Sequence, residues 1–456
     1  MWRAFRNAWN VKELRSRLLF TALIIVLVRF ASSIPCPGVD PAALAEFIKQ
    51  VAANSQNGGG LMAMIDLFSG GAVAHFALGA LGIMPYITAS IIMQLLVPVI
   101  PQLEKIQRDG EGGRQRISQY TRYLTLLVCA IQGAMVAAAM INPGKLGLPV
   151  PNQPLFTGSP LVFIPMTVLV LTCTTMVFTW LGEQITERGI GNGVSLIITI
   201  NIVSRLPHSV IELIDMARKG VTPAGTTFRP VQLLVLLTVF GIVTAATILL
   251  SQGYRRVPIQ MVRKTVGNKM MGGSTYMPLK VNFANVMPII FAGAILMVPA
   301  WLFRIMAERS GGWWITLAQS FQMDGAGYAI TYGLLILAFS FFWVANQFNP
   351  LQIADNLKKE GAYIPGISPG QATADFLDSA MTRVTAGGAV FLMALALFPM
   401  FLYNSFQIPF MVAQFFGGTS LLIMVGVVLD TMSQLESHLT MRHYDGFLKS
   451  GRLKSR

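Results

Sequence analysis

The chain has 456 residues, of which 54% are hydrophobic and only 12% charged, and its formal net charge at pH 7 is +14. Ordinary soluble domains carry about 25% charged residues, so this composition excludes a typical soluble protein and favours a membrane protein. Ten stretches are apolar and long enough to cross roughly 30 Å of hydrocarbon as helices. Their expected bounds are 18–34, 79–100, 123–141, 160–180, 190–205, 230–250, 281–303, 326–346, 384–402 and 413–431.

The basic residues are distributed unevenly between the two sides of the expected membrane. Ten spans place both termini on one side, and most Lys and Arg residues lie in the termini and loops of that side. This bias predicts a multi-pass membrane protein with both termini in the cytoplasm. The positive charge is therefore explained mainly by the orientation of the chain in the membrane. Arg29 falls inside the first span, close enough to its end for the side chain to extend to the membrane surface.

The first 40 residues contain no sign of a removed signal peptide. The N-terminal basic residues precede an apolar run, but no small-residue cleavage site follows, so the first span is expected to be retained. Cys36, Cys129 and Cys173 lie far apart without a CxxC motif, and the four histidines are scattered. We therefore expect the cysteines to serve packing, and we predict neither a metal site nor a cofactor.

Two apolar segments near the second span are unusual. Residues 57–76 are apolar enough to enter the membrane but too interrupted by glycines to cross it, so they are expected to form a re-entrant element against protein or water. In "GIMPYITASII" (82–92), Ile83, Ile87 and Ile91 are spaced by four residues. That spacing alone fits a helix face in lipid or in the core, and Pro85 is expected to bend the helix.

The fifth span opens with "GIGNG" and carries polar residues that should face the interior of the bundle. After it, a polar stretch divides the chain into two sets of five spans. An odd number per half predicts an inverted repeat. The expected parts are an N-terminal half (1–206), an external hinge loop (207–229), a C-terminal half (230–437) and a basic cytoplasmic tail (438–456).

The expected cytoplasmic loop 251–280 is strongly basic and has no acidic residue. Such a loop could bind a cytosolic partner or the RNA of a ribosome through counterion release. Orientation of the chain and contact with anionic lipid explain the same charges equally well. The loop alone leaves both interpretations open.

The sequence contains no motif that supports enzyme chemistry. "GISPG" (366–370) matches GxSxG, but Pro369 has no backbone N–H for an oxyanion hole and no strand precedes a helix there. Ion-coupled transporters carry acidic residues within their spans, and here we find only Asp430, at the edge of the last span. The sequence therefore predicts neither an enzyme nor a coupled transporter.

Three long stretches resemble the SecY family, the SecY/Sec61-alpha channel subunits of protein translocons. They are "ALGALGIMPYITASIIMQLL" (77–96), "WLGEQITERGIGNGVSLII" (180–198) and "FNPLQIADNLKKEGAYIPGISPGQATADFLDSAMTRVT" (348–385). The resemblance implies an all-α polytopic membrane protein, with ten transmembrane helices in two inverted five-helix halves that form a clamshell channel and a short re-entrant plug helix. It further implies that unfolded secretory proteins cross through the channel and that apolar segments leave sideways into lipid.

The resemblance also implies roles for particular residues. An apolar pore ring would consist of Ile83, Ile87, Val194, Ile198, Ile290 and Ile423; Val194 stands where isoleucine is frequent, and we expect the seal to hold. The plug falls on about 61–75, with Met64, Ile65, Asp66, Leu67, Phe68, Ser69 and Gly70 at its centre. Polar members of the lateral gate would be Thr88, Gln94 and Asn282.

The implied partners are the SecE and SecG subunits, the motor SecA, the ribosome, signal peptides, unfolded preproteins and membrane lipid. Docking of the motor or ribosome falls on loops 251–280 and 347–382, through Arg255, Arg256, Arg263, Lys264, Lys269, Lys358, Lys359 and Arg383. Ser368 stands where bacterial members commonly have arginine, so one basic contact is missing or moved. The alternative class is a small-solute transporter built from inverted repeats, which would need charged or coordinating groups at its midplane.

Overall fold

A computed structural model describes the chain in two compact units, residues 1–215 with 423–456 and residues 216–422. The described residues are 11–40, 42–44, 46–47, 69–72, 75–141, 155–156, 159–222, 227, 229–261, 264–266, 269–271, 274–310, 312–322, 325–406 and 408–452. Most of them lie in helices. Nine of the ten expected spans each overlap one helix, and the last, 413–431, overlaps two, α16 (Phe410–Gly417) and α17 (Thr419–Arg452). The inverted halves and the ten-span count stay predictions.

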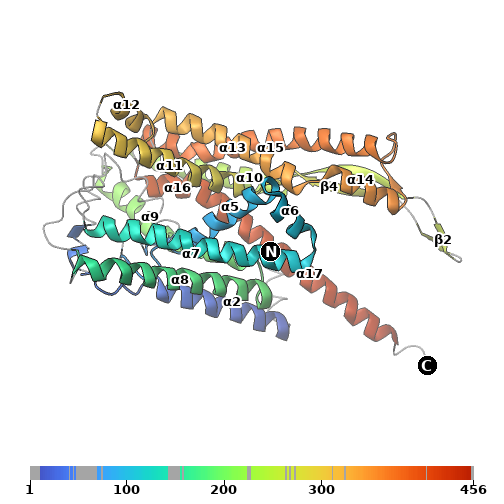
Figure 1. Cartoon of the computed structure of the whole chain (residues 1–456). Coiled ribbons are helices and arrows are strands. Elements are labelled where there is room, and N and C mark those ends of the chain that lie inside the picture. Colours follow the sequence, from blue (N-terminus) through green and yellow to red (C-terminus); the bar gives the residue numbers. More distant parts are fainter. Residues whose placement is uncertain are drawn as a thin grey trace. The chain divides into compact units, whose positions relative to one another are not determined.

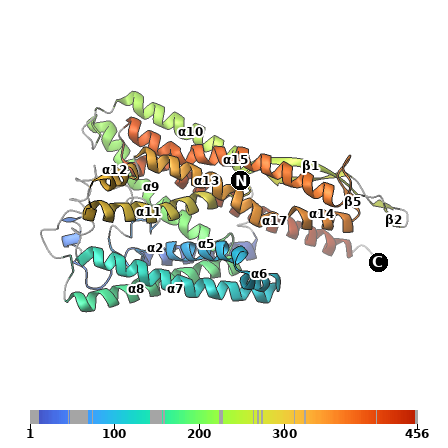
Figure 2. The same ribbon diagram turned by 45° about the horizontal axis from the view of Figure 1, so that its top comes forward.

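The first unit consists of α2 (Lys12–Ala31), α5 (Met84–Val99), α6 (Pro101–Arg108), α7 (Glu111–Ile141), α8 (Pro160–Arg188), α9 (Gly193–Lys219) and most of α17 (Thr419–Arg452). Helices α7 and α8 lie side by side, and α2 packs along α8 (Figures 1 and 2). A core at one end contains Cys36, Phe47, Phe76, Leu155 and Phe163. Burial raises the pKa of the Cys36 thiol to about 11, so this cysteine stays neutral at physiological pH and packs as an apolar group.

The second unit contains α10 (Pro230–Gln252), α11 (Met287–Ser310), α12 (Trp313–Ser320), α13 (Ala326–Gln347), α14 (Pro350–Lys359), α15 (Gln371–Phe406) and α16 (Phe410–Gly417). Helix α13 packs between α11 and α15. The ring of Phe291 on α11 meets Phe339 and Trp343 of α13 edge-on, with centroids 5.8 and 5.3 Å apart. Such pairs fix the register of two apolar helices beyond the effect of burial alone.

The second unit also holds strands that the all-α prediction did not include. Strand β1 (Tyr254–Met261) pairs antiparallel with β4 (Ser274–Lys280) and with β5 (Ala362–Tyr363), and β2 (Lys264–Val266) pairs with β3 (Lys269–Met271). Val257 and Ile259 are buried while their neighbours on β1 are exposed. This alternation is typical of a half-buried strand, so the basic loop 251–280 is a β-ribbon lying on α13 and α15.

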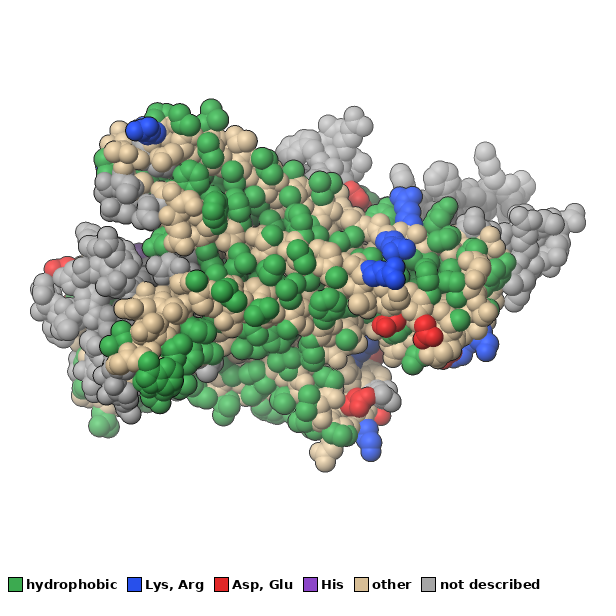
Figure 3. All heavy atoms as spheres, turned by 90° about the horizontal axis from the view of Figure 1, so that it is seen from above, with side chains coloured by type: hydrophobic (Ala, Val, Ile, Leu, Met, Phe, Trp, Pro, Cys, Tyr) green, Lys and Arg blue, Asp and Glu red, His purple; other side chains and the backbone are tan. Residues whose placement is uncertain are grey.

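Seven helices are long and apolar enough to cross a membrane, or eight if the bent pair α5–α6 counts as one span, among the described residues. Their apolar side chains point outward to an unusual degree; Leu161 is 87% exposed and Leu249 73%. Figure 3 shows hydrophobic side chains spread over the visible helices, with charged groups gathered towards the end that carries the β-ribbon. An apolar surface of this extent fits contact with lipid and not with water.

The prediction that Pro85 bends a helix is wrong. Helix α5 begins at Met84, so Pro85 occupies its first turn, where the missing N–H costs nothing. The bend comes later, where Pro98 and Pro101 flank Ile100, and it turns α5 from α6 by 103°. Pro85 thus lies in the first turn of α5, and the chain changes direction at Pro98 and Pro101.

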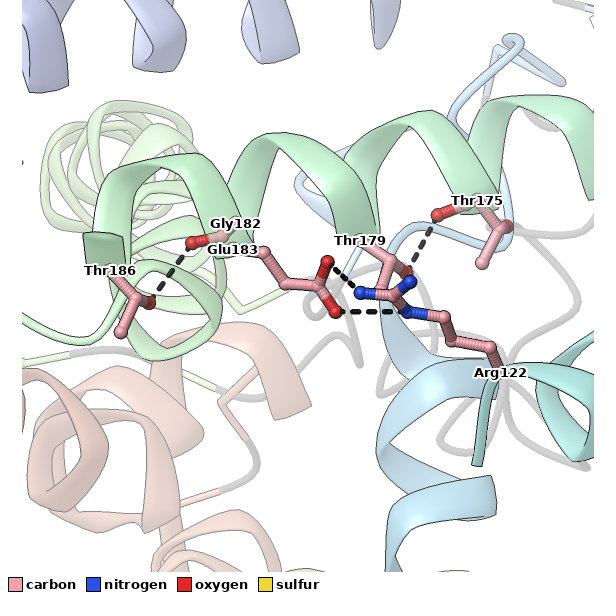
Figure 4. A network of polar contacts seen from close by, with 6 residues as sticks. All are labelled: Arg122, Thr175, Thr179, Gly182, Glu183 and Thr186. Carbon is pink, nitrogen blue, oxygen red and sulfur yellow. Dashed lines mark hydrogen bonds and ion pairs between the residues drawn. The ribbon is translucent and has the colours of Figure 1, made fainter. Parts of the chain in front are cut away.

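One ion pair links α7 to α8, and two hydroxyl groups of α8 form hydrogen bonds within that helix. Arg122 of α7 forms a two-pronged ion pair with Glu183 of α8, at 2.6 and 3.3 Å (Figure 4). Thr179 and Thr186 donate their hydroxyl hydrogens to carbonyls one turn earlier, at 2.9 and 3.0 Å. Each hydroxyl is thus satisfied within the helix, as an apolar environment requires.

Candidate functional site

The isoleucine row of α5 is buried. Ile83, the residue before the helix, is 1% exposed, Ile87 is 8% and Ile91 is 5% exposed. The preceding residues 75–83, which we name the α5 entry segment, fix where this helix starts. Cys36 donates its N–H to the Phe76 carbonyl at 2.9 Å, and Leu78 donates to Ile34 at 2.8 Å.

The sharp turn from α8 to α9 places Val194 and Ile198. Gly191 adopts φ +90°, a conformation that favours glycine, and its N–H donates to the Gln434 side chain of α17 at 3.0 Å. Asn192 caps α9 by accepting from the Ser195 N–H at 3.1 Å. A Cβ at Gly193 would overlap the Gly182 carbonyl, so α9 starts directly against the backbone of α8. These hydrogen bonds and the close approach of Gly193 to α8 together fix the position of the first turns of α9.

The remaining expected ring residues lie on two different units. Ile423 is 3% exposed in the first turns of α17, in the first unit. Ile290 is half-buried near the start of α11, in the second unit. Five of the six side chains thus belong to one unit, and the ring as a whole stays a prediction.

Of the expected plug, Met64, Ile65, Asp66, Leu67 and Phe68 lie outside the described residues, whereas Ser69 and Gly70 lie within them. Gly70 accepts hydrogen bonds from Arg29 of α2 and from Ser204 of α9. Arg29 thus binds protein groups inside the first unit, contrary to the expectation that it extends to the membrane surface. No local sequence pattern predicts this contact, because the partners lie 41 and 134 residues from Gly70 in the chain.

The three expected gate residues have different surroundings. Thr88 donates to the Met84 carbonyl at 3.1 Å, and Gln94, which is exposed, donates to Ser90 at 3.1 Å. Asn282 is 5% exposed and lines a cavity of about 10 Å³ in the second unit, with Ser340 of α13 and Thr385 of α15. That volume corresponds to about one water molecule. Their role in a gate stays a prediction.

The expected docking residues lie at one end of the second unit. Arg255 and Arg256 are exposed on β1, Lys358 and Lys359 are exposed in the last turn of α14, and Arg383 is exposed on α15. Strand β5, directly after α14, pairs with β1, and Tyr363 donates its hydroxyl hydrogen to Gln260 at 3.0 Å. The sheet therefore brings loops 251–280 and 347–382 together.

The tip of the ribbon is only partly described. Lys264 and Lys269 lie on β2 and β3, and Arg263 lies outside the described residues. Ser368 is exposed, and its carbonyl accepts from the Thr373 hydroxyl at 2.8 Å. A structured, solvent-facing loop thus surrounds the position where a basic residue was expected.

Several apolar helices of membrane-spanning length, with apolar side chains facing outward, define a polytopic membrane protein. The match to the SecY family covers residues 77–432, and the chain belongs to that family. It is 41% identical over 458 residues to the "Protein translocase subunit SecY" of Chlamydia muridarum, covering 99% of both chains.

Solved structures show the same fold. A protein-conducting channel covers 92% of this chain and 91% of its own length at 18% identity, with a TM-score of 0.59. Sec61 in a canine ribosome–channel complex gives the same coverages, at 17% identity and a TM-score of 0.58. These likenesses extend over nearly the whole chain.

Proposed function

We propose that this chain is the central subunit of a channel that moves unfolded secretory proteins across the plasma membrane and releases transmembrane segments sideways into lipid. Membership of the SecY family and the full-length similarity to a translocase subunit support this function. Its N-terminal and C-terminal halves would move about the hinge 207–229, with both termini in the cytoplasm. SecE and SecG would complete the complex.

The observation that carries the proposal is the position of the expected ring residues at helix starts. Ile83, Ile87, Val194 and Ile198 lie in the first turns of α5 and α9 or directly before them, each next to a sharp turn. A ring of apolar side chains can exclude ions by dewetting. β-branched residues suit this role because their rotamers are restricted and they offer no polar atom to a passing chain.

Ion conductance of the purified complex in planar bilayers tests the ring. Ile87→Asn and Ile290→Asn are expected to raise the leak of the resting channel, because a polar group lowers the cost of wetting the constriction. Ile87→Val is the matched control, since it removes one methylene and keeps the apolar surface; its leak should equal that of the unaltered protein. If both asparagine variants conduct no more than the valine variant in a plug-deleted background, the ring assignment is wrong.

We propose further that the β-ribbon and α14 bind the motor SecA and the ribosome. Exposed arginines on β1 and exposed lysines at the end of α14 lie on one structured end, which suits an acidic protein surface or RNA. The similar Sec61 comes from a ribosome–channel complex, which supports the second partner.

Charge reversal tests this docking. Arg255→Glu with Arg256→Glu is expected to weaken both associations by about tenfold or more at low salt, and less as salt rises, because screening removes the electrostatic part. Lys219→Glu, at the exposed end of α9 and on the expected outer side, is the control. Equal binding by both variants in a sedimentation assay contradicts the proposal.

A small-solute transporter remains the competing class, and co-purification separates the two. A stable complex with a small SecE-like partner supports the channel. A solitary protein that binds a solute supports the transporter.

A further inference from the structure

A polar cluster in the first unit surrounds two consecutive glycines at the described end of the expected plug. We name it the Gly70 cluster; its members are Arg29 of α2 and Asn201, Ser204 and Arg205 of α9, around Gly70 and Gly71. Asn201 is fully buried and Arg29 half-buried. Polar groups are costly within an apolar bundle unless they bind one another, so a cluster of four at one place requires a reason.

The contacts converge on one backbone carbonyl. Arg29 Nη1 donates to the Gly70 carbonyl at 3.2 Å and to Asn201 Oδ1 at 3.4 Å. Ser204 Oγ lies 3.3 Å from the same Gly70 carbonyl and 2.7 Å from the carbonyl of Asn201. Two helices that are far apart in sequence thus bind the same peptide group.

Both glycines are required by conformation and by space. Gly70 has φ +68° and Gly71 φ +93°, which residues with a Cβ rarely adopt. A Cβ at Gly70 would overlap Arg29 Nη1 and lie 3.0 Å from the Asn201 Cα. A Cβ at Gly71 would lie 2.6 Å from the guanidinium carbon of Arg205. The cluster therefore fits closely around a bare backbone.

Backbone hydrogen bonds also hold the chain between this cluster and the first isoleucine of the row. Ala77 donates its N–H to the Ala72 carbonyl at 2.8 Å, and the α5 entry segment then binds residues 34–36 on both sides of Ala77. Gly82 donates to Gly79 at 2.8 Å, directly before Ile83. Loss of the Gly70 contacts would thus loosen the segment that positions Ile83.

We propose that Arg29, Asn201 and Ser204 are positioning residues that hold the backbone at Gly70 and keep the resting channel closed. The inference rests on the proposed channel function, because it assigns the cluster to the idle state of that channel. Release of Gly70 from Arg29 and Ser204 would free residues 69–72 to move away from α2 and α9, while the helices themselves stay in place.

Hydrogen exchange of the full complex in lipid nanodiscs tests the contacts without depending on transport. Arg29→Gln is expected to speed exchange of the Ala72, Ala77 and Leu78 amides by about tenfold or more, because a charged donor is lost. Ser204→Ala should speed it by about fivefold. The Leu196 amide, inside α9, is the internal reference and should not change. Unchanged exchange at all three amides in both variants overturns the inference.

A pair of glycine variants separates contact from backbone strain. Gly70→Ala and Gly220→Ala introduce a methyl group at nearly the same φ, +68° and +66°, but nothing lies within 4 Å of a Cβ at Gly220. Gly70→Ala should therefore accelerate exchange at Ala72 and Ala77 and raise the ion leak in planar bilayers, whereas Gly220→Ala should do neither. Equal behaviour of the two variants contradicts a contact role.

The two readouts separate failure of this inference from failure of the proposed function. If the unaltered complex neither conducts nor translocates, the channel function fails, whatever the exchange rates. If it does, and the Gly70 cluster variants exchange faster without added leak, the cluster holds the segment but does not keep the channel closed, and the inference is wrong.

Discussion

Two helices that carry expected ring residues are entered by segments built in different ways. The α5 entry segment (75–83) is bound by backbone hydrogen bonds to residues 34–36 and contains the fully buried Phe76. The α11 entry segment (281–286) is bound at its start, where Val281 donates to Gly253 at 2.9 Å, and it presses against the backbone of α15. Each contains one non-glycine residue with positive φ, Phe76 at 41° and Asn285 at 52°.

In the first unit, burial of the Phe76 side chain sets where the helix starts. In the second unit, the close approach of the entry segment to the backbone of α15 does so. Beside the α11 entry segment, within the described part of the chain, Asn282 Oδ1 and Thr385 Oγ1 are buried without a hydrogen-bond partner from the protein, and both residues line the water-sized cavity. Such groups cost free energy. The α11 entry segment is therefore expected to open more readily than the α5 entry segment.

The largest expected effect is at Phe76. Phe76→Ala should lower the free energy of unfolding by about 3–5 kcal/mol, because it leaves a cavity and keeps the strained φ. Thermal unfolding in detergent measures this loss. Phe30→Ala is the control, since Phe30 is 66% exposed on α2 and should change the midpoint little. Equal shifts of the two unfolding midpoints would show that burial of the Phe76 side chain does not hold the α5 entry segment.

A methyl group at Gly388 tests the close approach in the second unit. Its Cβ would lie 2.5 Å from the Val281 carbonyl oxygen, so Gly388→Ala should cost about 1–3 kcal/mol by overpacking. The adjacent Gly387 has nothing within 4 Å, and Gly387→Ala should be neutral or stabilise α15 by up to about 1 kcal/mol. Opposite shifts of the two unfolding midpoints are expected. A tolerated Gly388→Ala would mean that the segment moves freely away from α15.

The helices were within reach of sequence reasoning because a membrane demands long apolar runs, which hydropathy detects directly. The β-ribbon could not be predicted in the same way, because the alternation on β1 is limited to two buried residues, Val257 and Ile259, among exposed neighbours, several of them polar or basic. The contacts of Arg29 could not be predicted, for a different reason. Its partners Gly70 and Asn201 are 41 and 172 residues away, so only the fold brings them together.

The smallest expected effect is at Asn285, and it separates backbone conformation from packing most cleanly. Asn tolerates the left-handed region, so Asn285→Gly should change the free energy of unfolding by no more than about 0.5 kcal/mol. Asn285→Ala should lower it by about 1 kcal/mol, because alanine lacks that tolerance. Asn285 is exposed, so neither change creates a cavity, and the difference between the two midpoints reports the backbone alone. If glycine and alanine give the same midpoint, the positive φ at Asn285 is not maintained in the membrane. The entry segment of α11 would then be fixed by the Val281–Gly253 hydrogen bond and by its contact with Gly388, unlike that of α5, where Phe76 keeps its conformation by burial.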